Sequence, residues 1–191
     1  EAADERRERF RESVRLHLRS DVPVGSCLSG GIDSSAIVAA VRHVAGPDAE
    51  IHTFSYVPDE PRLSEKRWID QVVEATGAVP HFVHPRPEDL VDGLDALIEA
   101  QGEPFAGTSI YAQHRVFEAA HEAGLKVMLD GQGADELLGG YQGMSRIARM
   151  VSLLRGRRGL SAIRYLSNLA LHAPDVKVGG FLARAIDRAV A

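Results

Sequence analysis

The chain has 191 residues, of which 45% are hydrophobic and 26% are charged, a composition typical of a globular domain with a substantial core. Its formal net charge of -5 argues against nucleic acids and anionic membranes as partners, and no apolar run is long enough to cross a bilayer. Because Cys27 is the single cysteine, no internal disulfide is possible, and we expect a cytoplasmic protein.

A charged amphipathic helix is predicted first, at residues 4–19. Four short apolar segments bounded by turn residues then predict buried strands, at residues 22–28, 51–57, 79–84 and 125–129. Helical patterns lie between these strands, and the helix at residues 64–76 is predicted to bury Trp68 and Ile69. A further helix opens at Pro87 and presents one apolar stripe through Ile98.

This alternation predicts an α/β fold with an open, mostly parallel sheet, helices on both faces and the strand order 3-2-1-4. From residue 142 onward the pattern changes to apolar and basic helical stretches with no strand signal. We therefore expect one α/β domain at residues 1–141 and a partial helical extension at residues 142–191. The helical pattern continues to the last residues, so we expect a piece of a longer protein.

The first predicted strand runs through Ser29, Gly30 and Gly31 into a helix. Free amide groups and the helix dipole favour an anion there, and the glycines let the backbone approach it closely. A nucleotide P-loop ends in a lysine, whereas this loop carries Asp33 followed by Ser34. Because a carboxylate is repelled by bound phosphates unless a cation separates them, the loop predicts a polyphosphate site with Mg²⁺. The simpler alternative is a tight turn of small residues.

The fourth predicted strand also runs into a glycine loop, which reads Asp-Gly-Gln-Gly-Ala-Asp-Glu at residues 130–136. In the order 3-2-1-4 the first and fourth strands are neighbours at a switch point, where open sheets bind their ligands. We therefore expect the two loops to face each other and Asp33 and Asp135 to bind one Mg²⁺. The alternative is that Asp135 only stabilises the N-terminus of a short helix.

The two loops together, Ser-Gly-Gly-Ile-Asp-Ser at residues 29–34 and the sequence from Asp130 to Tyr141, resemble the synthetase domain of glutamine-hydrolysing asparagine synthetases. These enzymes belong to the PP-loop ATP pyrophosphatase superfamily, and the resemblance covers about residues 5–145. It implies an adenine nucleotide alpha hydrolase-like fold and ATP with Mg²⁺ as cofactors. It also implies an N-terminal glutaminase domain in the longer protein.

The resemblance implies an AMP-forming carbon–nitrogen ligase of asparagine biosynthesis. The side-chain carboxylate of aspartate is adenylated with release of pyrophosphate, and ammonia from glutamine then displaces AMP. The implied partners are aspartate, ammonia or glutamine, and the glutaminase domain, and a homodimer is left open.

The resemblance also assigns roles by position. Adenosine would be held at Leu28, Tyr56, Asp130 and Gly131. Pyrophosphate would be held at Ser29, Gly30, Gly31, Asp33 and Ser34. The catalytic residues would be Asp33, Asp135 and Gln132, of which the two aspartates would bind the metal.

The chain departs from the family at Gln132, where relatives often carry an acid that is thought to take a proton in the ammonia step. An amide cannot take a proton. Two alternatives therefore stay open. One is an adenylating amide or lactam synthetase of specialised metabolism that uses another acid or amine, and the other is a non-catalytic remnant that binds nucleotide.

Overall fold

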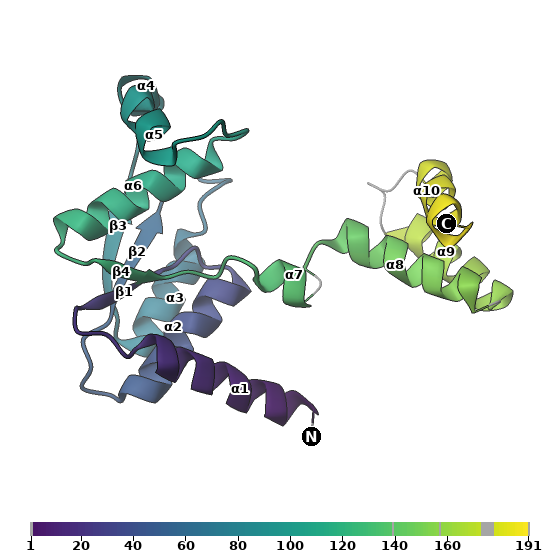
Figure 1. The fold of residues 1–191 in the computed structure, drawn as a ribbon, viewed down its shortest axis with the longest axis horizontal. Helices are drawn as coiled ribbons and strands as arrows, with labels where there is room; N and C mark the ends of the chain where they lie inside the picture. The colour runs from purple at the N-terminus through teal and green to yellow at the C-terminus, as the bar shows by residue number, and fades with distance from the viewer. Residues whose placement is uncertain (1, 139, 157, 173–177, 191) are drawn as a thin grey trace. The chain divides into compact units, whose positions relative to one another are not determined.

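The computed structural model describes residues 2–138, 140–156, 158–172 and 178–190 (Figure 1). The chain divides into two compact units, Glu1–Gly131 and Gln132–Ala191. The boundary that the sequence predicts, after residue 141, stays a prediction.

Within its described residues, the first unit holds one sheet of four parallel strands in the predicted order, β3-β2-β1-β4. The strands are β1 (Val24–Cys27), β2 (His52–Tyr56), β3 (Val79–Val83) and β4 (Val127–Leu129). Ser26 at the centre of the sheet is opposite Thr53 on β2 and Leu129 on β4. Pro80 lies in β3 at the sheet edge, where a residue without an N–H group is tolerated.

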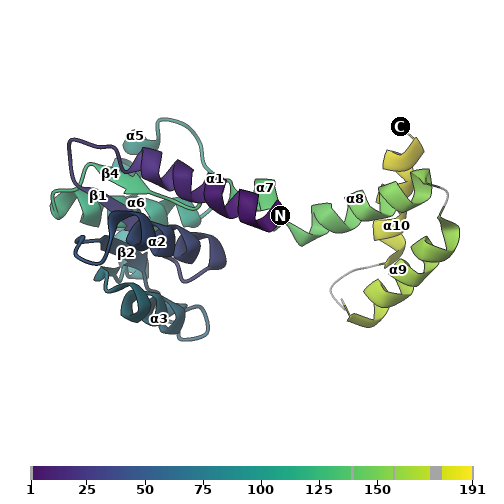
Figure 2. The same cartoon turned by 90° about the horizontal axis from the view of Figure 1, so that it is seen from below.

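Helices cover both faces of this sheet, as predicted (Figure 2). They are α1 (Ala2–His17), α2 (Ile32–Ala45), α3 (Lys66–Thr76), α4 (Pro87–Asp92), α5 (Leu94–Gln101) and α6 (Ser109–Glu122). On the face covered by α2 and α3, Leu28, Val38 and Ile69 form the centre of the core. On the opposite face Phe54 packs against Val116 of α6. The α/β class and its layers are thus confirmed.

Two local predictions about the helices are wrong. Trp68 is 44% exposed rather than buried, and the guanidinium of Arg67 lies 4.2 Å from the centre of its ring. The helix predicted to start at Pro87 is divided into α4 and α5. Gly93 is both the C-cap residue of α4 and the N-cap residue of α5. The apolar residues keep their helical spacing across Gly93, so the sequence pattern did not reveal the break.

The second unit contains the short helix α7 (Ala134–Leu138) and three longer helices, α8 (Gln142–Arg155), α9 (Gly159–His172) and α10 (Val178–Val190). Met150, Phe181 and Ala185 form the centre of its own apolar core. The helical character predicted for the end of the chain is therefore confirmed. Across the described ranges of both units, no helix combines the length and apolar character needed to span a membrane.

Candidate functional site

The loop after β1 is closed on itself by two serine hydroxyls. The Ser29 N–H group donates to Ser34 Oγ at 3.2 Å, and the two hydroxyl oxygens lie 3.1 Å apart. Ser29 Oγ in turn accepts a hydrogen bond from the Gly31 N–H group at 3.2 Å, and Ser34 Oγ donates to the Gly31 carbonyl at 3.3 Å. These hydrogen bonds stabilise the conformation of the loop.

The N-terminus of α2 presents backbone amides beside this loop. Gly31 occupies the N-cap position with an extended backbone, and among the described residues no side chain caps the helix. The first bond of the helical ladder runs from the Ser35 N–H group to the Gly31 carbonyl at 3.0 Å. The amides at residues 32–34 precede that bond, so they lie outside the ladder and can donate to an anion, which the helix dipole also favours.

Gly30 fits a position that no other residue could occupy without strain. Its φ of 84° lies in the left-handed region, and a Cβ atom there would lie 3.0 Å from Trp68 Cβ and 3.1 Å from the Glu65 carbonyl oxygen. The start of α3 therefore packs directly against the loop, which explains why Trp68 is near the site although its ring is exposed.

The beginning of the second glycine loop lies against the first loop. A Cβ atom at Gly131 would be 3.3 Å from both Asp33 Cβ and Ser34 N. Within the strands that precede the two loops, Ser26 Oγ of β1 donates a hydrogen bond to the Leu129 carbonyl of β4 at 3.3 Å. The structure thus brings Leu28, the loop at residues 29–34 and Gly131 together at the carboxyl ends of neighbouring strands.

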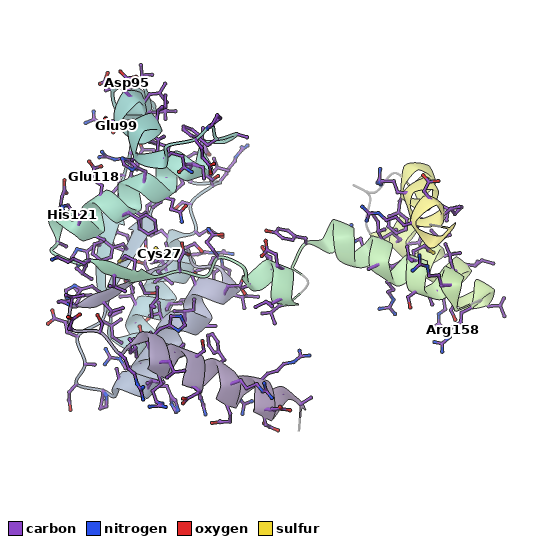
Figure 3. The ribbon with its side chains drawn as sticks, in the orientation of Figure 1. Cys27, Asp95, Glu99, Glu118, His121 and Arg158 are labelled. Carbon is purple, nitrogen blue, oxygen red and sulfur yellow. The ribbon has the colours of Figure 1, made fainter. Side chains whose placement is uncertain are left out.

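Asp130 is oriented by α6. Its Oδ2 accepts a hydrogen bond from Gln113 Nε2 at 3.0 Å. Burial, and then the negative charge of Asp130, raise the pKa of the Cys27 thiol to about 12. Cys27 lies within the sheet (Figure 3), so the thiol stays protonated and is no nucleophile.

A hollow of about 730 Å³ opens beyond the carboxyl ends of β2 and β3, on the face of the sheet that α6 covers. Tyr56 at the end of β2 lines it, which places this predicted adenosine residue in a cavity rather than on a plain surface. The other lining residues include Pro85, Arg86, Leu90, Thr108 and Tyr111. The lining combines apolar and aromatic surface with the charged side chains of Asp59, Glu60 and Arg86.

Gln132 and Asp135 belong to the second unit, where Asp135 lies in the first turn of α7 and Gln132 in the turn before it. Asp135 packs so closely on Gly140 that a Cβ atom at Gly140 would clash with its carboxylate. The convergence of Asp33 and Asp135 on one metal stays a prediction. No group of three or more metal-binding side chains occurs among the described residues, so a two-carboxylate site would take its other ligands from phosphate and water.

A four-stranded parallel sheet with an anion-binding loop at the switch point defines the class: an α/β nucleotide-binding domain of the PP-loop ATP pyrophosphatase type. A family model described as asparagine synthase matches residues 5–187. The chain belongs to the asparagine synthase family.

Curated proteins support the same family. A putative glutamine-hydrolysing asparagine synthetase 2 of Methanocaldococcus jannaschii is 35% identical over 130 residues, which are 68% of this chain and 25% of that protein. The glutamine-hydrolysing asparagine synthetase 1 of Bacillus subtilis is 35% identical over 135 residues, 71% of this chain and 21% of that protein. The amidase chry2 of Gibberella zeae is 33% identical over 152 residues, 71% of this chain and 22% of that protein. The chain thus spans a quarter or less of the length of these relatives.

Two residues at the site were not predicted from the sequence. Gln113 and Tyr111 lie in α6, where their spacing suggested only an ordinary amphipathic helix. The residues reach the site because α6 packs across the face of the sheet that holds Phe54. Tyr111 lies in the first turn of α6, and nothing in the sequence marked it as a residue of the site.

Proposed function

We propose that this chain is the ATP-binding part of an AMP-forming ligase that makes asparagine from aspartate, ATP and ammonia. The observation that carries the proposal is the contact between the two glycine loops, in which Gly131 packs against Asp33 and Ser34. A phosphate bound to the first loop would therefore lie beside the start of the second. Membership of the asparagine synthase family supports ATP as the nucleotide.

The pyrophosphate portion of ATP would bind at the loop formed by Ser29, Gly30, Gly31, Asp33 and Ser34. The amides at the start of α2 would donate to phosphate oxygens, and the two serine hydroxyls would turn toward them. Asp33 and Asp135 would hold Mg²⁺. Asp33 fits this role because, within the described part of the chain, its carboxylate makes no hydrogen bond or ion pair. Bound Mg²⁺ would neutralise negative charge on the departing pyrophosphate.

The adenosine portion would lie against Leu28, Tyr56, Asp130 and Gly131. The hollow beside Tyr56 supports this placement, because a nucleotide whose phosphates lie at the β1 loop can direct its base over the end of β2. The hydrogen bond from Gln113 fixes the Asp130 carboxylate, and its second oxygen remains available to accept from a ribose hydroxyl.

In the first step an oxygen of the aspartate side-chain carboxylate bonds to the α-phosphorus, and the bond from that phosphorus to the β-phosphate oxygen breaks. Pyrophosphate leaves with the electron pair, and the α2 amides and loop hydroxyls stabilise its charge. In the second step ammonia attacks the activated acyl carbon, AMP leaves and the amide forms. Gln132 would hydrogen-bond to the incoming amine but cannot take its proton, which passes to another acceptor.

The partners follow from the same proposal. Glutamine would supply the ammonia through a glutaminase domain of the full-length protein. The relatives in Methanocaldococcus jannaschii and Bacillus subtilis are named as glutamine-hydrolysing enzymes. We propose a cytoplasmic protein, and a homodimer stays open.

The test is the aspartate-dependent exchange of labelled pyrophosphate into ATP by the full-length protein. We expect exchange with the wild type and none with Asp33→Asn, because an amide is a poor Mg²⁺ ligand beside phosphates. The Asp33→Asn variant should keep its circular dichroism spectrum and melting temperature. Asp48→Asn, which makes the same charge change at an exposed turn position, should keep full exchange. Full activity of Asp33→Asn would exclude Asp33 as a metal ligand.

Two alternatives predict different results in this assay. A synthetase that uses another acid or amine is favoured by Gln132 and by the similarity to a protein named as an amidase. If the acid differs, exchange occurs only with acids other than aspartate; if only the amine differs, aspartate supports exchange but ammonia gives no asparagine. A non-catalytic remnant would show no exchange with any acid. Titration with ATP and Mg²⁺ then separates a remnant that binds nucleotide from a chain with no site.

A further inference from the structure

The start of α3 carries two basic side chains close to the first glycine loop. The two atoms nearest to the Cβ position of Gly30 are Trp68 Cβ at 3.0 Å and the Glu65 carbonyl oxygen at 3.1 Å. Lys66 and Arg67 lie between these two residues in the sequence, in the first turn of α3. The backbone that carries both basic side chains therefore packs against the loop proposed to bind pyrophosphate.

The two basic groups differ in their partners. Lys66 Nζ donates to both carboxylate oxygens of Asp70, at 2.7 Å and 2.8 Å, and lies 4.6 Å from the centre of the Phe82 ring. The exposed Arg67 guanidinium makes no hydrogen bond or ion pair within the described part of the chain. The charge of Lys66 is therefore neutralised within α3, whereas the charge of Arg67 is available to a ligand.

The Trp68 ring is the one group that the Arg67 guanidinium contacts among the described residues. Arg67 Cζ lies 4.2 Å from the centre of this ring, which is 44% exposed and whose Cβ atom packs against Gly30. A guanidinium stacked on an aromatic ring keeps its N–H donors available, and this contact is weak where water reaches it. A phosphate group, which forms stronger charge-assisted hydrogen bonds with arginine, can draw the guanidinium away from the ring.

We propose that Arg67 binds the β- and γ-phosphates of ATP and remains bound to the pyrophosphate as it leaves. The phosphates of ATP together with the carboxylates of Asp33 and Asp135 carry more negative charge than one Mg²⁺ ion neutralises, so the site requires a further cation. Arginine suits this role because its parallel N–H groups match two phosphate oxygens. This inference rests on the proposed function, because it requires the phosphates of ATP at the loop after β1.

Calorimetric titration of the full-length protein with inorganic pyrophosphate and Mg²⁺ measures this contact without adenosine. We expect Arg67→Gln to weaken the binding of pyrophosphate about tenfold, the loss of one charge-assisted hydrogen bond, and to weaken the binding of ATP by a similar factor. AMP, which lacks the β- and γ-phosphates, should bind to Arg67→Gln as it does to the wild type. The melting temperature should not change, because the side chain is exposed.

Two further variants separate a specific contact from the general charge of α3. Lys66→Gln removes the same charge one residue away and is the matched control. It should bind pyrophosphate as the wild type does, because Asp70 already holds the Lys66 ammonium group. Arg67→Lys should bind pyrophosphate more tightly than Arg67→Gln but less tightly than the wild type, because it keeps the charge and loses the paired donors.

The outcomes separate this inference from the proposed function. If the wild type binds ATP and Arg67→Gln binds pyrophosphate equally well, the role of Arg67 is overturned and the proposed function stands. Equal losses in Arg67→Gln and Lys66→Gln would also overturn it, because the effect would then come from charge at a distance. An equal weakening of AMP would overturn it as well, because the contact would not be with the β- and γ-phosphates. Failure of the wild type to bind ATP would overturn both.

Discussion

At the scale of single residues, the candidate site depends on glycines that bring backbone groups close together. Gly30 has a positive φ and is surrounded by Trp68 and Glu65, whereas Gly102, at the end of α5, also has a positive φ but has no atom within 4 Å of its Cβ position. The two glycines therefore separate the effect of backbone conformation from the effect of crowding.

We expect Gly30→Ala to lower the free energy of unfolding by about 2–3 kcal/mol and to abolish ATP binding, because both the backbone and the added methyl group are strained. Gly102→Ala should cost about 1 kcal/mol, from backbone strain alone, and keep ATP binding. Urea unfolding and calorimetric titration measure the two effects. Equal losses of stability in the two variants would show that the contacts of Gly30 with α3 do not matter.

At the scale of helices and loops, one side chain joins α2 to two other segments. The Arg42 guanidinium donates to the carbonyls of residues 46, 47 and 49 in the loop before β2, at 2.7–2.9 Å. Its Nε donates to the Thr76 carbonyl at 2.6 Å and its Nη2 to the Gly77 carbonyl at 3.4 Å, both at the end of α3. Carbonyls at a helix end have no partner in the helix, so Arg42 satisfies groups that would otherwise depend on water.

Arg42→Lys should lower the free energy of unfolding by about 2 kcal/mol, because an ammonium group cannot reproduce the planar set of donors. The matched control is Arg9→Lys, whose exposed pair with Glu5 contributes little. Denaturant unfolding measures both variants. If Arg42→Lys is as stable as the control, the five hydrogen bonds do not contribute in solution.

A pair of histidines on neighbouring strands should make stability depend on pH. His52 Nδ1 lies 3.0 Å from His81 Nε2, and the ring of Phe54 stacks on that of His81 at 4.4 Å. Burial, and then the nearby His52, lower the pKa of His81. The unfolded chain therefore binds the proton more readily than the folded chain, so stability falls as the pH drops below about 6.5.

His81→Asn should make the decline in stability between about pH 7 and pH 5 shallower, because its titrating group is absent. His43→Asn, at an exposed position of α2, should keep the wild-type slope. Urea unfolding at several pH values measures both. An unchanged slope in His81→Asn would exclude the histidine pair as its cause.

The sequence predicted the strand order because the alternation of short apolar strands with helices, joined by right-handed crossovers, leaves few topologies. The first glycine loop could be predicted from local chemistry, since glycines and an acid precede a helix. Trp68 was wrongly predicted to be buried. It lies next to the buried Ile69, and helical spacing alone cannot tell whether such a residue is covered by another element or lies at the exposed edge of the buried face. The role of Arg42 could not be predicted, since its partners come from separate segments of the chain. The burial of Tyr111 could not be predicted either, since it depends on the packing of α6.

At the scale of the whole molecule, the chain provides a parallel sheet with glycine loops at its strand ends and a helical unit with its own core. The proposed reaction needs residues of both units, since Asp33 belongs to the first and Asp135 to the second. The central claim is therefore that these two carboxylates bind the same metal ion with ATP.

The most direct test is a double-mutant cycle on the affinity for Mn²⁺ in the presence of ATP, read from the electron paramagnetic resonance signal of free Mn²⁺. We expect Asp33→Asn and Asp135→Asn each to weaken Mn²⁺ binding, and the double variant to lose much less than the sum of the two losses, because both carboxylates serve one ion. Strictly additive losses, or Mn²⁺ affinity unchanged in Asp135→Asn, would contradict the shared metal site.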